Sequence, residues 1–225
     1  GAHPDDVELG CGGAVIKLIE QGKKVAIIDL TRGELGTRGT AKRRNKECEN
    51  ATKILGVRVR ENMGFKDGFF ENDEGHKLAL IKKIRDYQPE IVIANAPSDR
   101  HPDHGRASQI VVDACFLSGL EKVDTKQKVW RPKAIYHYIQ FNHLQPDFVI
   151  DISGQMEKKI EAVKTYKTQF FNADSKETET IISKKGFLES VKYRAKDLGR
   201  LSNCEFAEGF ISHQMLKVDS FFDIK

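Results

Sequence analysis

Two short segments of this chain carry the residue types that bind metal ions and move protons. The first reads His-Pro-Asp-Asp at residues 3–6, and the second reads His-Pro-Asp-His at residues 101–104. In each segment a proline stiffens the backbone between the histidine and the carboxylate. Imidazoles and carboxylates are the ligands that a catalytic zinc ion takes. If the fold brings the two segments together, the sequence predicts a hydrolytic metal centre.

The spacing predicts which of these side chains hold the metal. A catalytic zinc keeps three protein ligands and one open position, and His3, Asp6 and His104 form such a set. Two histidines and one carboxylate leave one formal positive charge on the site, which acidifies bound water and polarises a substrate carbonyl. Asp5 cannot easily share a small coordination sphere with its neighbour Asp6. We therefore expect Asp5 to be the base that takes a proton from the water.

The second segment leaves His101 and Asp103 outside the ligand set. A carboxylate beside an imidazole favours its protonated form and fixes its orientation. We expect His101 to stabilise an oxyanion and donate a proton, with Asp103 orienting it. One such segment alone would be interpreted as a turn or a cap, and a closed structural zinc site would favour four ligands, commonly cysteines. The remaining histidines have no comparable neighbours and are interpreted as surface or core residues: His76, His137, His143 and His213.

Composition favours a globular protein and excludes several other classes. The 225 residues are 39% hydrophobic and 31% charged, and their apolar runs are of strand length, too short to span a bilayer. No secretory leader is expected. A net charge of +4 is too small to indicate nucleic-acid binding. The dispersed cysteines favour buried side chains in a reducing cytoplasm, and Cys11 is expected to pack on a helix start rather than bind metal.

The order of the elements predicts one α/β domain over residues 1–225 with a mostly parallel central sheet. Because the chain opens directly on the first motif, we expect a first strand upstream of residue 1. Carboxyl ends of parallel strands meet at one edge, so residues 3–6, 31–33 and 95–104 are expected to converge there. Strands are predicted at 25–31, 90–96, 134–140 and 148–152. Helices are predicted at 41–55, 155–170 and 187–201. Three further helices are expected to start at residue 14, to end at residue 88 and to start at residue 104.

Segments 2–13 and 99–104 resemble those of the LmbE-like, or PIG-L type, family of zinc-dependent N-acetylglucosaminyl deacetylases. The similarity covers almost the whole chain, including 165–170 and 207–210. Within the family, segment 30–40 is most similar to the deacetylase of bacillithiol biosynthesis. The resemblance implies a Rossmann-like three-layer fold, one Zn²⁺ per chain, a cytoplasmic location and a homo-oligomer.

The resemblance implies the same ligands, base and acid as the spacing, and it adds Arg44 as a side chain that reaches the site. From composition alone, Arg44 would be one of three exposed basic residues. The substrate implied for the subgroup is N-acetylglucosaminyl L-malate, whose carboxylates suit arginine. The candidates near the predicted edge are Arg32, Arg38, Arg44 and Arg100, of which Arg44 and Arg100 rank first.

Several alternatives share the same residues. The enzyme could deacetylate N-acetylglucosamine, chito-oligosaccharides or another N-acyl sugar conjugate, or act as an amidase on thiol conjugates. A non-catalytic, metal-dependent sugar-binding module would be expected to lack the base or the acid, yet Asp5 and His101 are both present. Fe²⁺ or Co²⁺ accept the same ligands as Zn²⁺. The expected partner is a small N-acetylated sugar, with neither nucleic acid nor membrane.

Overall fold

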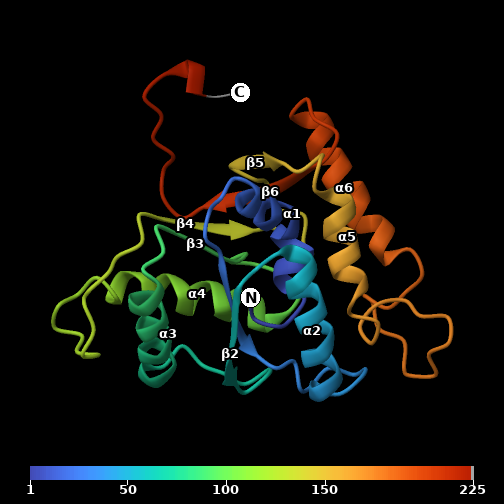
Figure 1. Cartoon of the computed structure of the whole chain (residues 1–225), viewed down its shortest axis with the longest axis horizontal. Coiled ribbons are helices and arrows are strands. Elements are labelled where there is room, and N and C mark those ends of the chain that lie inside the picture. The colour runs from blue at the N-terminus through green and yellow to red at the C-terminus, as the bar shows by residue number, and fades with distance from the viewer. Residues whose placement is uncertain (224–225) are drawn as a thin grey trace.

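The structure, a computed structural model, describes residues 1–223 and alternates helices with strands (Figure 1). The helices are α1 (Asp6–Glu20), α2 (Ala41–Leu55), α3 (Glu74–Tyr87), α4 (Pro102–Leu117), α5 (Met156–Lys164), α6 (Phe187–Leu201) and the short 3-10 helix η1 (Phe221–Asp223). The strands are β1 (Ala26–Thr31), β2 (Val59–Phe65), β3 (Ile91–Asn95), β4 (Ala134–Tyr138), β5 (Phe148–Asp151) and β6 (Ala207–Ser212). Within residues 1–223, no helix has the length and apolar character needed to cross a membrane.

The described strands form two sheets in an α/β fold, one parallel and one mixed. β1 and β2 pair in parallel, and the second sheet has the order β3-β4-β6-β5. β3 and β4 are parallel, whereas β6 runs antiparallel to both β4 and β5. The expectation of a mostly parallel central sheet is therefore wrong. The reason is β6, a strand that was not predicted, which lies between β4 and β5 and runs in the opposite direction.

The first residues of the chain connect the two sheets. Ala2 accepts a hydrogen bond from the backbone N–H of Thr31 at the end of β1 (3.0 Å). The N–H of Ala2 donates to the side-chain oxygen of Asn95 at the end of β3 (2.9 Å). The first motif therefore starts at the carboxyl ends of two strands, which is where open α/β sheets bind ligands.

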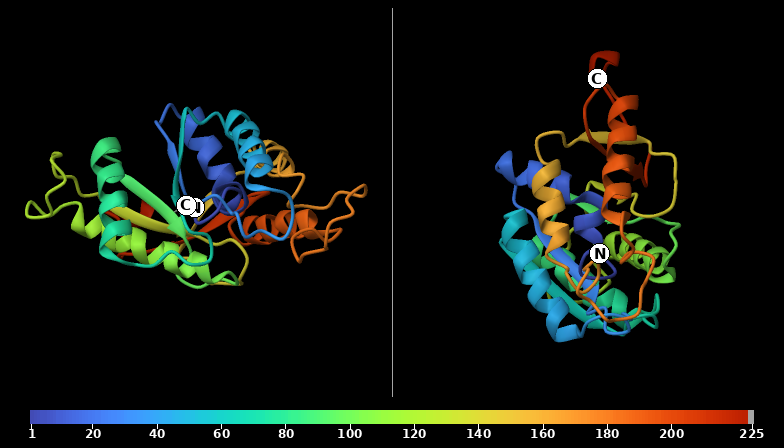
Figure 2. Two further views of the ribbon diagram at one scale, coloured as in Figure 1. Left: turned by 90° about the horizontal axis from the view of Figure 1, so that it is seen from below. Right: turned by 90° about the vertical axis from the view of Figure 1, so that its right-hand side faces the viewer.

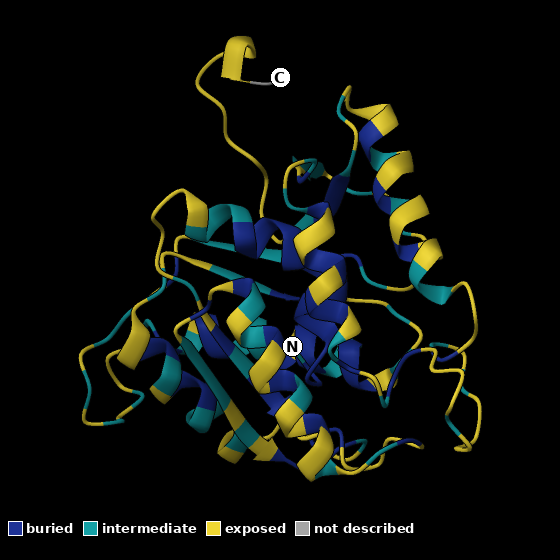
Figure 3. Ribbon diagram, turned by 45° about the vertical axis from the view of Figure 1, so that its right-hand side comes forward, coloured by how far each residue is buried: buried dark blue, intermediate teal, exposed yellow. Residues whose placement is uncertain are grey.

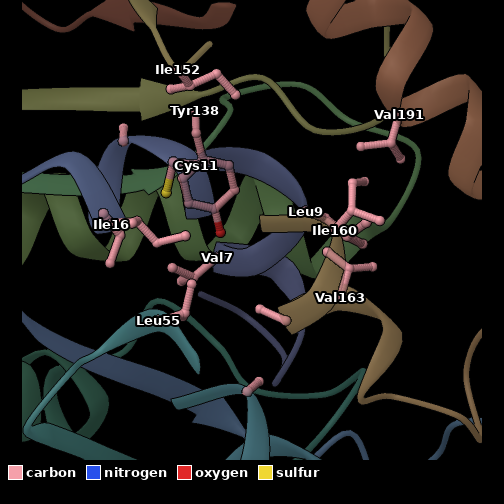
Figure 4. Close-up of a cluster of buried hydrophobic side chains, with 14 of the residues drawn as sticks. Val7, Leu9, Cys11, Ile16, Leu55, Tyr138, Ile152, Ile160, Val163 and Val191 are labelled. Atoms are coloured by element: carbon pink, nitrogen blue, oxygen red, sulfur yellow. The ribbon is translucent and has the colours of Figure 1, made fainter. Parts of the chain in front are cut away.

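Glycines allow α1 to approach the strands closely. A Cβ atom at Gly10 would lie 2.1 Å from the ring of Tyr138, and one at Gly13 would lie 2.8 Å from Ile152. Tyr138 lies among the buried apolar side chains of α1 and α5 (Figure 4). These contacts stabilise a helix through a glycine-rich segment of low helix propensity.

A kink divides α1, and β6 supplies a cap for its second half. Cys11 has a non-helical φ of −145°. Glu208 of β6 accepts the N–H groups of Gly13 and Ala14 at 2.9 and 2.7 Å, as an N-cap carboxylate does. The buried ammonium of Lys159 pairs with Glu208 at 2.6 Å. Burial raises the pKa of the Cys11 thiol, in agreement with the predicted packing role.

Helices pack on both sides of the strands (Figure 2). One apolar cluster joins α1, α2, α5 and α6 to β4 and β6, and the other joins α3 and α4 to the ends of β1 and β2. The first half of α1 is buried, whereas the segment after β6 is exposed and extends away from the body (Figure 3). The carboxyl ends of β1, β2, β3 and β4 remain available for the site.

Candidate active site

Both His-Pro-Asp motifs fold as helix N-termini, but in different registers. Asp5 is the N-cap of α1 and Asp6 begins the helix, whereas His101 is the N-cap of α4 and Pro102 begins it. Proline in the first turn and acidic residues near a helix N-terminus both favour a helix start. The shared pattern therefore starts a helix at each place. The different registers place the equivalent aspartates, Asp5 and Asp103, in different surroundings.

The three predicted ligands lie together and are buried. Asp6 Oδ1 lies 3.2 Å from His104 Nε2, and Asp6 Oδ2 lies 3.5 Å from His3 Nδ1. The carboxylate of Asp6 also accepts the N–H of His3 (2.9 Å) and the side-chain amides of Asn95 (3.1 Å) and Gln140 (2.8 Å). A carboxylate fixed between two imidazoles is the donor set of a catalytic divalent cation. These residues therefore fit such an ion.

Each of the two imidazoles has a carboxylate at its other nitrogen. His104 Nδ1 lies 2.7 Å from Asp99 Oδ2. His3 Nε2 lies 3.0 Å from Asp67 Oδ1 and 3.2 Å from Asp103 Oδ2. A carboxylate in this position fixes the ring orientation and the tautomer of a metal-binding histidine. The arrangement leaves His104 Nε2 and His3 Nδ1 facing Asp6.

The cluster is strongly negative. Burial alone would lower the pKa of His104, but the carboxylates of Asp6 and Asp99 raise it to about 9. Burial likewise opposes protonation of His3, and hydrogen bonds to Asp103, Asp6 and Asp67 raise its pKa well above the usual value. Carboxylates that hold protons on two buried imidazoles create the potential that a divalent cation would neutralise.

His101 belongs to the same cluster, since ring nitrogens of His3, His101 and His104 lie within 4.8 Å of one another. The prediction that the Asp103 carboxylate orients His101 is wrong. His101 Nδ1 accepts the backbone N–H of Asp103 (3.2 Å), while the first turn of α4 directs the Asp103 carboxylate toward His3 and the N–H of Gly68. Burial, His3 and His104 lower the pKa of His101 to about 4, so its neutral ring carries the proton on Nε2.

Asp5 lies beside the proposed ligands and is paired with Arg44. The guanidinium lies 2.8 Å from Asp5 Oδ2 and also donates to the carbonyl of Pro4 at 2.9 and 3.1 Å. Burial raises the pKa of Asp5 to about 6, against the charge of Arg44, which lowers it. Asp5 also has a φ of +117°, a strained conformation that costs about 1–3 kcal/mol and is common at functional sites.

A pocket of about 810 Å³ opens over this cluster. Arg44 reaches it, as the resemblance implies, but its charge is engaged by Asp5. Arg100 lines the pocket and lies over the ring of Phe141 at 4.9 Å. Arg32 is exposed beside Gly64 and is not part of the pocket wall. The rest of the wall is mixed. Its apolar side chains include Leu35, Phe69, Ile181, Ile182, Phe187 and Val191, and its polar side chains include Thr37, Arg38, Gln169, Thr180, Ser190 and Arg194.

Four side chains that support the cluster were given no role from the sequence, although Asn95 and Asp99 belong to the segment 95–104 that was expected at this edge: Asn95, Asp67, Asp99 and Gln140. A common signal could have found them. Asn95 and Asp99 end and follow β3, and Asp67 and Gln140 each lie two residues after a strand, β2 and β4 respectively. The carboxyl-end rule that predicted where the motifs meet applies equally to these positions.

Comparison with known proteins identifies the family. Residues 1–115 match the family described as PIG-L: GlcNAc-PI de-N-acetylase. The chain belongs to this family. It is 30% identical over 180 residues to the diacetylchitobiose deacetylase of Thermococcus kodakarensis, a match that covers 75% of this chain and 67% of the relative.

The chain is also similar to a second curated protein and to a solved structure. The probable N-acetyl-alpha-D-glucosaminyl L-malate deacetylase 2 of Bacillus anthracis is 25% identical over 181 residues, covering 75% of this chain and 78% of the relative. The structure of a conserved protein from Thermus thermophilus superposes with a TM-score of 0.88 at 34% identity, covering 97% of this chain and 95% of that structure.

These matches establish the class of the protein but not the subgroup. The protein is an enzyme of the PIG-L/LmbE-like deacetylase family. The expected special similarity to the bacillithiol enzyme is not supported, because the malate deacetylase matches at lower identity than the chitobiose deacetylase.

Proposed function

We propose that this protein removes the N-acetyl group from an N-acetylglucosaminyl compound, and that a divalent cation, Zn²⁺ in our proposal, is required. One observation carries the proposal. The carboxylate of Asp6 lies between His3 and His104, at the floor of a pocket that also contains Asp5 and His101. Ligands, base and oxyanion donor thus face the same volume, as amide hydrolysis requires.

His3, Asp6 and His104 would hold the cation. A bound divalent cation supplies a Lewis acid that polarises the acetamide carbonyl and makes water more acidic. Asp67, Asp103 and Asp99 hold the two imidazoles in the orientation that ligation needs. Fe²⁺ and Co²⁺ suit the same donors, so reloading a stripped sample with each ion separately identifies the most active metal.

Asp5 is proposed as the general base. Its pKa of about 6 keeps it ionised at neutral pH while leaving it basic enough to accept a proton from the attacking water. Arg44 holds the carboxylate in place. The same carboxyl group can return the proton to the departing amine.

His101 is proposed as the oxyanion donor. Because its Nδ1 accepts a backbone N–H, the neutral ring presents Nε2–H as a fixed donor. A neutral donor suits this position, since the nearby imidazoles of His3 and His104 disfavour a further positive charge. Of the two roles expected for His101 from the sequence, we keep oxyanion stabilisation. The group that orients the ring is the backbone N–H of Asp103 rather than its carboxylate.

The sugar conjugate favoured by the pocket is an acetylated amino-sugar oligosaccharide of the chitobiose type. The apolar part of the wall, which includes Phe141 and Phe187, suits the apolar face of a second sugar ring. N-acetylglucosaminyl L-malate is the second candidate, because Arg38 and Arg100 also line the pocket. Arg44 is less suited to binding malate because it is paired with Asp5.

Amine release from three substrates tests the proposal. Diacetylchitobiose, N-acetylglucosaminyl malate and N-acetylglucosamine are compared at equal concentration, with and without a chelator. We expect chelator-sensitive release, fastest from diacetylchitobiose. Faster amine release from N-acetylglucosaminyl malate would reverse the ranking of the two candidate substrates. Tight sugar binding without release from any of the three would indicate a binding module instead.

From the family resemblance we further propose that residues 1–225 act as one domain, in the cytoplasm and as a homo-oligomer. The single domain is supported by packing of α5 on both α1 and α2 and by the contribution of α6 to the pocket wall. Light scattering of the purified protein and cell fractionation test the other two proposals.

A further inference from the structure

Asp67 connects a proposed metal ligand to the loop that walls the pocket. It follows β2, its side chain is buried, and its two oxygens have different partners. Oδ1 lies 3.0 Å from His3 Nε2, and Oδ2 accepts the backbone N–H of Leu35 at 2.9 Å. Leu35 and Gly36 belong to the pocket wall. One carboxylate therefore joins the proposed metal centre to the surface that a substrate would touch.

Glu34 holds the same loop to the backbone of Asp67. Glu34 Oε1 accepts the N–H of Asp67 at 2.9 Å, and Oε2 accepts the N–H of Arg32 at 3.2 Å. Glu34 and Asp67 thus exchange contacts across the gap between the two loops, each carboxylate holding a backbone N–H of the other segment. We name this pair of contacts the Glu34–Asp67 clasp. Glu34 itself is exposed, and its carboxylate binds backbone N–H groups rather than a proposed metal ligand.

Asp103 also contacts His3, but the other contacts of its carboxylate lie in a different part of the chain. Its carboxylate is held by the N–H of Gly68 (2.8 Å) and by Arg106 (3.0 Å), so it belongs to the start of α4. Of the two carboxylates on His3 Nε2, Asp67 is the one whose second oxygen binds the loop at 33–36. Asp67 is therefore the carboxylate that links the position of that loop to the orientation of the His3 ring.

We propose that Asp67 is a positioning residue that couples the order of the 32–36 loop to cation binding at His3. The inference rests on the proposed metal site. An imidazole whose Nε2–H donates to a fixed carboxylate presents Nδ1 for ligation, and His3 Nδ1 is the nitrogen that faces Asp6. Coupling of this kind is reciprocal, so the cation orders the loop to the extent that the loop favours the cation.

The test uses variants that leave the proposed ligands intact. Asp67→Asn puts an amide where two hydrogen-bond donors require acceptors, and Glu34→Ala opens the clasp from its exposed side. We expect cation affinity, measured by competition with a chromophoric chelator, to fall about 10–100-fold in Asp67→Asn and by a smaller factor in Glu34→Ala. Glu34→Gln keeps one acceptor and is expected to lie between Glu34→Ala and wild type. Glu71→Gln, an exposed carboxylate in the same connection, is the matched control.

Hydrogen exchange provides a readout that needs no activity. In wild type, cation binding is expected to slow exchange of the backbone amides at 33–36, and Asp67→Asn is expected to abolish that slowing. If folded Glu34→Ala and Asp67→Asn both bind the cation like wild type, the coupling is overturned. It is also overturned if Asp67→Asn alone weakens binding while loop exchange is unaffected by the cation. A wild-type protein that binds no cation would instead reject the proposed function.

Discussion

The guanidinium of Arg44 lies 2.8 Å from the carboxylate of Asp5, and both side chains are buried. The pair sets the pH at which Asp5 can act as a base. Burial raises the pKa of Asp5 to about 6, and the charge of Arg44 keeps it from rising further. A base works only when ionised, so kcat/KM is expected to rise with pH through this pKa and level off above it.

Replacing Arg44 should shift the pH at which kcat/KM rises. In Arg44→Gln the lowering charge is lost, so the pKa of Asp5 rises and the ascent of kcat/KM shifts to higher pH. The activity loss is therefore larger at pH 6 than at pH 8. The neighbouring exposed residue gives the control, Arg43→Gln, which should keep the wild-type profile. An unshifted ascent in Arg44→Gln would contradict the role of the pair.

Removing the proposed base should separate chemistry from cation binding. Asp5→Asn keeps the shape of the side chain but cannot accept the proton. Loss of general-base catalysis typically lowers the rate by about 10²–10⁴-fold. We expect kcat to fall by this order while the bound metal, measured by plasma mass spectrometry, stays at the wild-type level. Turnover near wild type would assign the base to another group.

His101 and His104 lie three residues apart but should behave differently. Loss of an oxyanion donor costs about 10²–10³ in kcat, so His101→Ala is expected to retain the metal and lose turnover. His104→Ala removes a ligand and should lose both. The exposed His143 gives the control His143→Ala, which should change neither. Metal loss in His101→Ala with retention in His104→Ala would exchange their roles.

Cation affinity should depend on pH in a defined direction. Asp6 and Asp99 raise the pKa of His104 to about 9 against the effect of burial, and a protonated imidazole cannot ligate. Below that pKa the cation must displace a proton. Affinity is therefore expected to increase from pH 7 to pH 9, with proton release detectable by calorimetry in buffers of different ionisation enthalpy. An affinity independent of pH over this range would show that His104 does not ligate.

The pairing of Glu208 with Lys159 should matter for stability rather than chemistry. Glu208 caps the second half of α1 and neutralises a buried ammonium at 2.6 Å. Removing one partner of a buried ion pair costs about 3–5 kcal/mol, so Glu208→Ala should lower the midpoint of denaturant unfolding strongly. The double variant Glu208→Leu with Lys159→Met should recover part of this loss. Equal midpoints for wild type and Glu208→Ala would contradict the account.

Much of the fold follows from local sequence. α2 and α6 have the predicted bounds, and β1, β3, β4 and β5 fall within a residue or two of the predicted strands. α1 begins eight residues before the predicted start because contacts with Tyr138 and Ile152 stabilise its glycine-rich segment. Those contacts join distant parts of the chain and leave no local signal.

β2 was not predicted either, because its contacts also join distant parts of the chain. The side chain of its Arg60 is buried against Glu8 of α1 (2.5 Å) and Asp29 of β1 (2.8 Å). Neither partner can be assigned without the fold. At the site, residue types and the carboxyl-end rule predicted that the two motifs would meet. They did not reveal that Asp103 would contact His3, because that depends on the helix register of α4.

The most direct test of the central claim is amine release from diacetylchitobiose by stripped protein as Zn²⁺ is added back. If the two His-Pro-Asp motifs hold one catalytic ion, stripped protein is inactive, and activity rises with added metal to a plateau at one equivalent per chain. Full activity in protein shown to contain no transition metal would contradict the claim.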